Sequence, residues 1–218
     1  MSPPRALHCK KIHPFYLHRY FCVTTLAMRV FFVALFSLCL VLAGCERKPV
    51  FNALDITGIE GYGSDFRLID HTGRPRTMAD FRGKVVVMFF GYTHCPDVCP
   101  TTLAEMRQVM QILGKDAERL QVLFVTVDPA RDTPELLSKY VPSFNPTFLG
   151  LYGDGAATEK VARDFKIIYR RAEGKTAESY SVDHSAASLV FDPQGRLRLF
   201  ITYGLGADKI APDIKKLL

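Results

Sequence analysis

Two cysteines carry the clearest capacity for chemistry in this chain: Cys95 and Cys99, in the stretch GYTHCPDVCP at residues 91–100. An apolar run precedes the pair and a helix-like run follows it. At positions i and i+4 of a helix start, two side chains lie on one face with Cβ atoms roughly 5–6 Å apart. Such a pair can close a disulfide after a modest adjustment, bind a metal ion or attack a substrate. Two neighbouring thiolates suit soft metal ions, Cu(I) above all.

The expected position at a helix N-terminus favours reactive sulfurs, because partial positive charge there stabilises the thiolate over the thiol. Pro96 and Pro100 restrict the backbone around the pair, which keeps the sulfurs in place with or without a metal. A purely structural disulfide is the less favoured interpretation, because so short a loop closes little chain entropy.

A copper ion held by two thiolates commonly takes one more donor, and the candidates beyond the leader are His71, His94 and His184. His71 lies in an expected turn, and we expect it at the surface. His94 adjoins Cys95, so its side chain should point away from that sulfur and support or pack against the site. His184 stands just before an apolar run of strand type at residues 188–192.

The elements that position these residues alternate between apolar runs of strand type and amphipathic helical segments. Thr102 and Glu105 have the spacing of a capping box, and Gly114 is expected to end that helix. We predict strands at residues 66–70, 85–90, 120–127, 148–152, 166–170, 188–192 and 196–202, and helices at residues 101–114, 133–143, 156–165 and from about residue 207.

This order predicts an α/β protein with a central mixed sheet flanked by helices, ending in a β-hairpin and a helix. The arrangement resembles the thioredoxin-like fold, which keeps its redox pair between a buried strand and the next helix, where Cys95 and Cys99 stand. In that fold the loop before the strand at residues 188–192 crosses over the cysteine pair and usually presents a proline. Here the loop has no proline and carries His184, which we predict as the third ligand.

Three stretches closely resemble the Sco/SenC copper proteins of cytochrome c oxidase assembly: FRGKVVVMFFGYTHCPDVCPTTL (residues 81–103), VDPARDTPE (127–135) and VDHSAASLVFD (182–192). The resemblance covers about residues 50–218. It implies a thioredoxin-like domain that faces the periplasm and binds one copper ion, Cu(I) or Cu(II), through Cys95, Cys99 and His184. Such proteins serve the CuA centre of oxidase subunit II as copper donors, as reductants of its cysteines, or both.

Two other functions compete with copper delivery. One is a thiol–disulfide oxidoreductase that uses Cys95 and Cys99 to reduce cysteines of a partner, and the other is a peroxidase-like enzyme. The C-x-x-x-C spacing and the histidine in place of the proline argue against an efficient general oxidoreductase. We interpret the protein mainly as a metallochaperone and leave a reductase activity open.

The stretch DPARD, residues 128–132, follows a predicted buried strand, where ligand sites of α/β proteins often lie. A helix cap explains Asp132 or Thr133. For Asp128, Arg131 and Asp132 we favour a structural or docking role over a ligand role.

The N-terminal region predicts secretion and a lipid anchor. Arg29 and the apolar residues 30–43 make a secretory signal within residues 28–44, and the run is shorter than the ~20 residues of a membrane-spanning helix. LAGC at residues 42–45 resembles the lipobox of bacterial lipoproteins, which predicts acylation of Cys45 on the periplasmic side of a bacterial membrane. An uncleaved transmembrane anchor is the alternative, and Met28 is a second candidate for the true start.

The charge balance of the chain argues against nucleic acid as a partner. Residues 1–45 hold five of the 28 basic residues and none of the 22 acidic ones, which leaves 23 basic against 22 acidic residues in the body. A nearly neutral body offers no large positive field to nucleic acid. We predict a leader at residues 1–44, a lipidated cysteine and tether at 45–64, and the copper-binding domain at 65–218.

Overall fold

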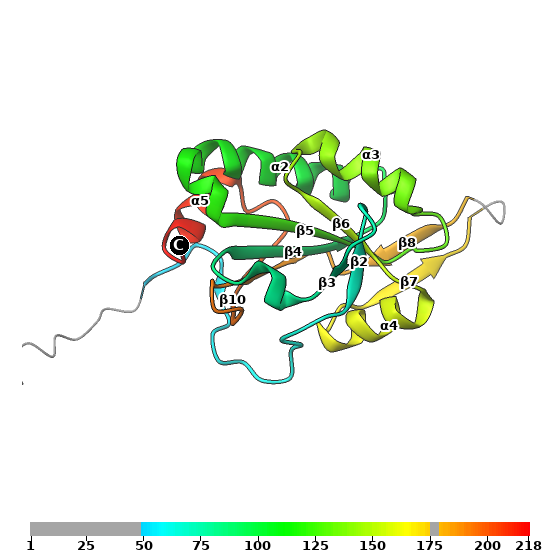
Figure 1. The fold of residues 1–218 in the computed structure, drawn as a ribbon, viewed down its shortest axis with the longest axis horizontal. Helices are drawn as coiled ribbons and strands as arrows, with labels where there is room; N and C mark the ends of the chain where they lie inside the picture. The colour runs from blue at the N-terminus through cyan, green and yellow to red at the C-terminus, as the bar shows by residue number, and fades with distance from the viewer. Residues whose placement is uncertain (1–48, 175–178) are drawn as a thin grey trace, which may run out of the picture. The chain divides into compact units, whose positions relative to one another are not determined.

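Two fully buried strands form the centre of the protein. The computed structural model describes residues 49–174 and 179–218. In it, β4 (Val85–Gly91) and β5 (Leu120–Thr126) are buried at every position and pair in parallel. Apolar residues fill both strands because both faces of the sheet are covered (Figure 1), as is typical of parallel strands.

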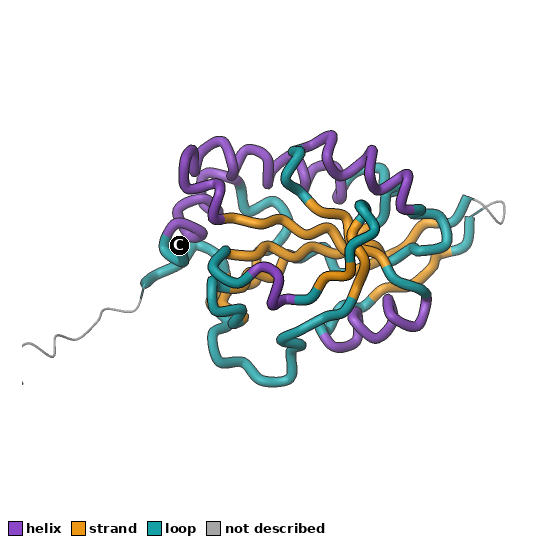
Figure 2. The backbone as a smooth tube through the Cα atoms, in the orientation of Figure 1, coloured by secondary structure: helices purple, strands orange, loops and turns teal. Residues whose placement is uncertain are grey.

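The neighbouring strands extend this pair into a mixed sheet, which lies between helices (Figure 2). Its order is β1-β10-β9-β4-β5-β6-β2-β3. The strands beyond the central pair are β1 (Leu54–Asp55), β2 (Leu68–Asp70), β3 (Pro75–Arg76), β6 (Leu149–Tyr152), β9 (Ser188–Phe191) and β10 (Leu197–Ile201). A separate two-stranded ribbon joins β7 (Tyr169–Ala172) to β8 (Ser181–His184).

Helices cover the two faces of the sheet unequally. On one side lie α2 (Val98–Leu113), α3 (Pro134–Phe144) and α5 (Ala207–Lys215), and on the other lies α4 (Gly155–Asp164) (Figure 1). Short 3₁₀ helices occupy Met78–Phe81 and Gly114–Arg119. Alternate residues of β4 enter the two cores: Phe89 joins the core under α2, and Phe90 joins the core with α4. The α/β architecture and the closing hairpin and helix are as predicted.

Helix α2 begins earlier than the sequence indicated. Its first residue is Val98, so Cys99 lies in the first helical turn. The predicted capping box at Thr102 and Glu105 is wrong, because the N-cap position is Asp97. Glu105 instead accepts a hydrogen bond from the backbone N–H of Gly206 (2.9 Å) and thereby ties α2 to the segment that leads into α5.

Part of the predicted tether belongs to the domain. Within residues 45–64, Leu54 and Asp55 form β1 and pair with β10. The buried carboxylate of Asp213 accepts hydrogen bonds from the N–H groups of Asn52 (2.7 Å) and Ala53 (2.8 Å). Sequence periodicity missed this because a two-residue edge strand depends on its distant partner and not on its own pattern.

The predicted signal at residues 28–44 and the lipidated Cys45 lie outside the described residues. Among residues 49–174 and 179–218, no helix has the length and apolar character needed to cross a membrane.

Asp70 stabilises the turn between β2 and β3 through a charged carboxylate. Burial opposes its ionisation, but hydrogen bonds from Thr72, Arg76 and the backbone of Arg74 lower the pKa of Asp70 to about 2. An aspartate whose pKa is lowered on folding adds stability above its unfolded pKa, and this is lost as the pH falls through the folded pKa.

Replacing Asp70 with Asn should therefore lower the free energy of unfolding at pH 7 by about 2–3 kcal/mol. The difference from the unsubstituted protein should shrink as the pH falls from about 4 toward 2, because the unfolded chain then binds a proton at Asp70 that the folded protein binds only near its lower pKa. Urea unfolding at pH 7 and pH 2.5 measures both effects. Asp116→Asn, which alters only an exposed ion pair with Lys215, is the matched control and should change little. An equal loss at both pH values would contradict the assignment.

Candidate metal centre

The pairing of β4 with β9 brings the cysteine loop and the histidine segment to one end of the sheet. The two strands are antiparallel, and Phe89 of β4 lies opposite Ser188, the first residue of β9. The chain that leaves β4 toward Cys95 and the chain that enters β9 from His184 therefore meet beyond the same sheet edge. Eighty-five residues of sequence separate Cys99 from His184, yet the sheet makes them neighbours.

Sγ of Cys99 lies 3.7 Å from Nε2 of His184. The other ring nitrogen of His184, Nδ1, lies 2.8 Å from the carbonyl oxygen of Val182. A carbonyl oxygen only accepts hydrogen bonds, so Nδ1 carries the proton and, in the neutral ring, Nε2 presents its lone pair to the sulfur. Tyr92 holds the ring from the side through an edge-to-face contact, with 5.7 Å between ring centres.

Cys95 lies at the same place but is oriented differently. Its Sγ accepts a hydrogen bond from the backbone N–H of Cys99 (3.5 Å), and the residue is half-buried. A surface pocket of about 350 Å³ is lined by Tyr92, Cys95, Pro96, Asp97, Val98, Ser181, Val182, Asp183, His184 and Ala186. Cys95 and His184 thus share one pocket that is open to solvent.

The three predicted ligands converge without forming a closed coordination set. Both cysteines are free thiols. Within the described part of the chain, no group of three His, Cys, Asp or Glu side chains is arranged to hold a metal ion. The structure pairs Cys99 with His184 and brings Cys95 to the pocket that His184 lines. The donor types, two sulfurs and one imidazole, fit a soft ion such as Cu(I). Metal ligation by the three remains a prediction.

The sequence led us to expect easily ionised sulfurs at the helix start, and for Cys99 this is wrong. Cys99 is 0% exposed, and burial raises the pKa of its thiol well above the usual range, although a backbone hydrogen bond from Tyr92 acts in the opposite direction. Desolvation of the thiolate outweighs the helix N-terminus here. The helix-start N–H points to Cys95 instead.

Within the described residues, the other two histidines, His94 and His71, make their hydrogen bonds away from the sulfurs. His94 is half-exposed and contacts its neighbour Thr93 (Nδ1 to Oγ1, 3.1 Å), consistent with a supporting role. His71 was expected as a surface residue, but it is partly buried, and its Nδ1 accepts a hydrogen bond from the N–H of Gly150 (3.0 Å). Burial lowers the pKa of His71, which favours the neutral ring that this hydrogen bond requires.

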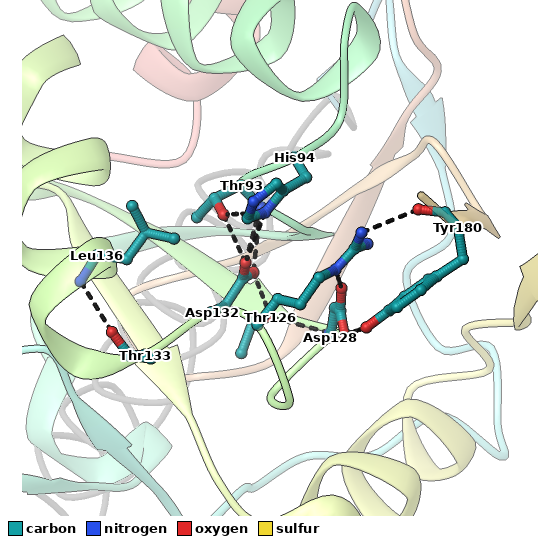
Figure 3. A network of polar contacts seen from close by, with 9 residues as sticks. Thr93, His94, Thr126, Asp128, Asp132, Thr133, Leu136 and Tyr180 are labelled. Carbon is teal, nitrogen blue, oxygen red and sulfur yellow. Dashed lines mark hydrogen bonds and ion pairs between the residues drawn. The ribbon is translucent and has the colours of Figure 1, made fainter. Parts of the chain in front are cut away.

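A polar network lies beside the site, where the sequence analysis favoured a structural or docking role for Asp128, Arg131 and Asp132 without predicting their partners. Figure 3 shows Asp132 between Thr93 and Thr126, with Asp128 beside Tyr180. Thr133 is the N-cap of α3, and its hydroxyl accepts a hydrogen bond from the N–H of Leu136 (3.2 Å). Capping therefore does not explain Asp132. The sequence signals were the position of these acids directly after a buried strand and the resemblance of residues 127–135 to the Sco/SenC proteins.

Comparison with known proteins identifies the family. The SCO1/SenC family pattern matches residues 55–218. The chain belongs to the SCO1/SenC family. It is 38% identical over 154 residues to the mitochondrial protein SCO2 homolog of Bos taurus, an alignment that covers 70% of this chain and 58% of that relative. The chain thus spans less than two thirds of the length of that relative.

Solved structures of the SCO1/SenC family share the fold. Bradyrhizobium japonicum ScoI with copper bound is 38% identical, with a TM-score of 0.67 over 72% of this chain and 99% of that one. Yeast Sco1 with copper bound is 30% identical, with a TM-score of 0.66 over 72% of this chain and 87% of that one. The predicted thioredoxin-like fold is confirmed.

Gly91 makes room for the buried sulfur. A Cβ atom at this position would lie 2.7 Å from Cys99 Sγ and 2.9 Å from a ring carbon of Phe124. Gly91→Ala should therefore destabilise the protein by roughly 1–3 kcal/mol and displace Cys99. Thermal unfolding measures the loss, and Gly155→Ala, where a Cβ meets open space, is the control. Unchanged stability in Gly91→Ala would show that the sulfur is not confined as described.

The raised pKa of Cys99 predicts slow alkylation. In reduced, metal-free Cys95→Ser, the remaining Cys99 should react with iodoacetamide far more slowly than the remaining Cys95 of Cys99→Ser. Its rate should rise with pH only well above the ordinary cysteine pKa of about 8.5. Mass spectrometry across a pH series gives both rates. Equal rates in the two variants would contradict the burial argument.

Proposed function

We propose that this SCO1/SenC protein binds one copper ion through Cys95, Cys99 and His184 and delivers it during assembly of cytochrome c oxidase. The observation that carries the proposal is the 3.7 Å approach of Cys99 Sγ to Nε2 of His184. Family membership and the copper in the related ScoI and Sco1 structures support it.

The donor set suits transfer better than permanent storage. Two sulfurs favour Cu(I), and the imidazole also tolerates Cu(II). Three protein donors leave one side open, so an incoming ligand can bind before the old ones leave. The pocket that Cys95 and His184 share opens to solvent and offers that approach.

Binding also releases protons. A thiol must lose its proton to become a ligand, and burial disfavours the thiolate of Cys99 until a cation stands beside it. Copper affinity should therefore fall as the pH falls.

The recipient and the location follow from the family resemblance and from the N-terminal sequence. We propose the CuA centre of oxidase subunit II, or another periplasmic copper protein, as the recipient. Acylation of Cys45 would anchor the domain on the periplasmic side of a bacterial membrane.

A second candidate function is reduction of disulfides in a partner. Cys95 is accessible and receives a helix-start N–H, whereas Cys99 is buried behind it. This is the order expected of an attacking and a resolving cysteine. Such chemistry uses both sulfurs and does not need His184.

Replacing His184 with Ala separates the two functions. Cu(I) affinity, measured by competition with a chromophoric chelator, should fall by more than about 100-fold, beyond the usual effect of residues outside the ligand set. Reduction of a disulfide substrate should persist. His71→Ala is the matched control, since its ring bonds the N–H of Gly150 and not the sulfurs, and it should bind copper normally.

Cys95→Ser and Cys99→Ser should each abolish tight binding. If His184→Ala binds copper as tightly as the unsubstituted protein, ligation by His184 is wrong. Rapid disulfide reduction with no measurable copper binding would favour the second function.

A further inference from the structure

The loop between β5 and α3 contacts both the cysteine loop and the segment that leads to His184. Val127 continues the central pairing through a hydrogen bond from its N–H to the carbonyl of Gly91 (2.8 Å), so the loop starts beside the cysteine loop. The N–H groups of Arg131 and Asp132 both donate to the carbonyl of Asp128, at 3.2 and 3.0 Å. These hydrogen bonds fold residues 128–132 into one tight turn, which we call the DPARD turn.

Asp132 holds the loop that carries Cys95. Its carboxylate accepts hydrogen bonds from the N–H (3.1 Å) and the hydroxyl (2.5 Å) of Thr93, and from the hydroxyl of Thr126 (2.6 Å). Thr93 stands two residues before Cys95, whose own N–H closes a turn onto the carbonyl of Tyr92 (3.2 Å). Asp132 therefore fixes the backbone from which Cys95 extends.

Arg131 and Asp128 hold the segment that leads to His184, through their contacts with Tyr180. Nη1 of Arg131 donates to the carbonyl of Tyr180 (2.9 Å), and the guanidinium stacks over the Tyr180 ring at 3.5 Å. The Tyr180 hydroxyl donates to Asp128 (2.8 Å), and Asp128 also accepts from Nε of Arg131 (2.5 Å). Three parts of one tyrosine are thus bound to the DPARD turn.

Tyr180 immediately precedes β8, the strand that carries His184. Strand β8 belongs to the separate two-stranded ribbon, and among residues 49–174 and 179–218 it pairs with no strand of the main sheet. Its place over the cysteines therefore depends on contacts such as those of Tyr180. Arg131 also lies 5.7 Å from the ring centre of Tyr92, which packs against the His184 ring.

We propose that Asp128, Arg131 and Asp132 are positioning residues that set the separation between the two sulfurs and the His184 imidazole. This inference rests on the proposed copper-binding function. These residues act on different ligands. Arg131 and Asp128 position His184, and Asp132 positions the cysteine loop. The planar fork of Arg131 suits this task, because it bonds a carboxylate, a carbonyl and a ring face at once.

The test is a pair of double-mutant cycles with His184→Ala. Arg131→Gln should weaken Cu(I) binding by roughly 10-fold or more, the range for residues that orient ligands. In the His184→Ala background, the same change should have almost no further effect, because its target is gone. Asp132→Asn should weaken binding in both backgrounds, since it acts on the cysteines.

Arg171→Gln is the matched control. Arg171 lies in β7 and stacks on the same Tyr180 ring at 3.6 Å, so it shares the ring contact without belonging to the DPARD turn. It should retain copper affinity within about threefold, below the 10–100-fold range of ligand-orienting residues. Absorption of the Cu(II) form gives an independent readout, since Arg131→Gln should shift its sulfur-to-copper charge-transfer band and Arg171→Gln should not.

The outcomes are distinct. If His184→Ala itself leaves affinity unchanged, the proposed function fails. If His184→Ala weakens binding but Arg131→Gln has no effect, or the same effect in both backgrounds, the positioning role is overturned. Should Arg131→Gln not fold, Tyr180→Phe decides, because it removes the hydrogen bond to Asp128 and keeps the ring. It should show a smaller loss that again disappears without His184, and a loss of equal size without His184 would overturn the role.

Discussion

The candidate site depends on one constraint, the antiparallel register between β4 and β9. Because Phe89 lies opposite Ser188, the end of β4 and the start of β9 coincide, and the segments beyond them must meet. The parallel pairing of β4 with β5 brings the end of β5 to the same edge. Cysteines, histidine and the DPARD turn therefore come from three strands that the main sheet aligns. A one-residue slip of β9 would reverse the direction of each of its side chains and move His184 away from Cys99.

Burial of Cys99 sets the chemistry of the pair. Its sulfur lies against Gly91 and is closed off from solvent, so the neutral thiol is the stable form in the absence of a cation. Cys95, half-buried at the helix start, remains accessible. The two sulfurs thus differ in exposure and reactivity, although the C-x-x-x-C spacing alone does not distinguish them.

The sequence predicted the parts of this arrangement that local pattern determines. The strands at Val85–Gly91 and Leu120–Thr126 follow from unbroken apolar runs, and the pairing of Cys95 with Cys99 follows from their spacing. Features that depend on distant partners were missed: β1, β8, the hydrogen bond of His71 and the carboxylate of Asp132. The start of α2 was placed at residue 101 because the capping signal at Thr102 and Glu105 looked local, whereas Glu105 bonds Gly206.

The position of Cys95 links the two candidate functions. Its Sγ accepts from the Cys99 N–H at 3.5 Å, a weak contact that a rotation of the side chain would break. The side chains of Cys95 and Cys99 also interact, so the two sulfurs can serve either a disulfide or an ion that Cys99 and His184 would share. His184 biases this choice only toward metal, because its Nε2 presents a lone pair and cannot join a disulfide. An imidazole held beside the two sulfurs therefore favours metal binding over a disulfide, and the DPARD turn holds that imidazole in place through Tyr180.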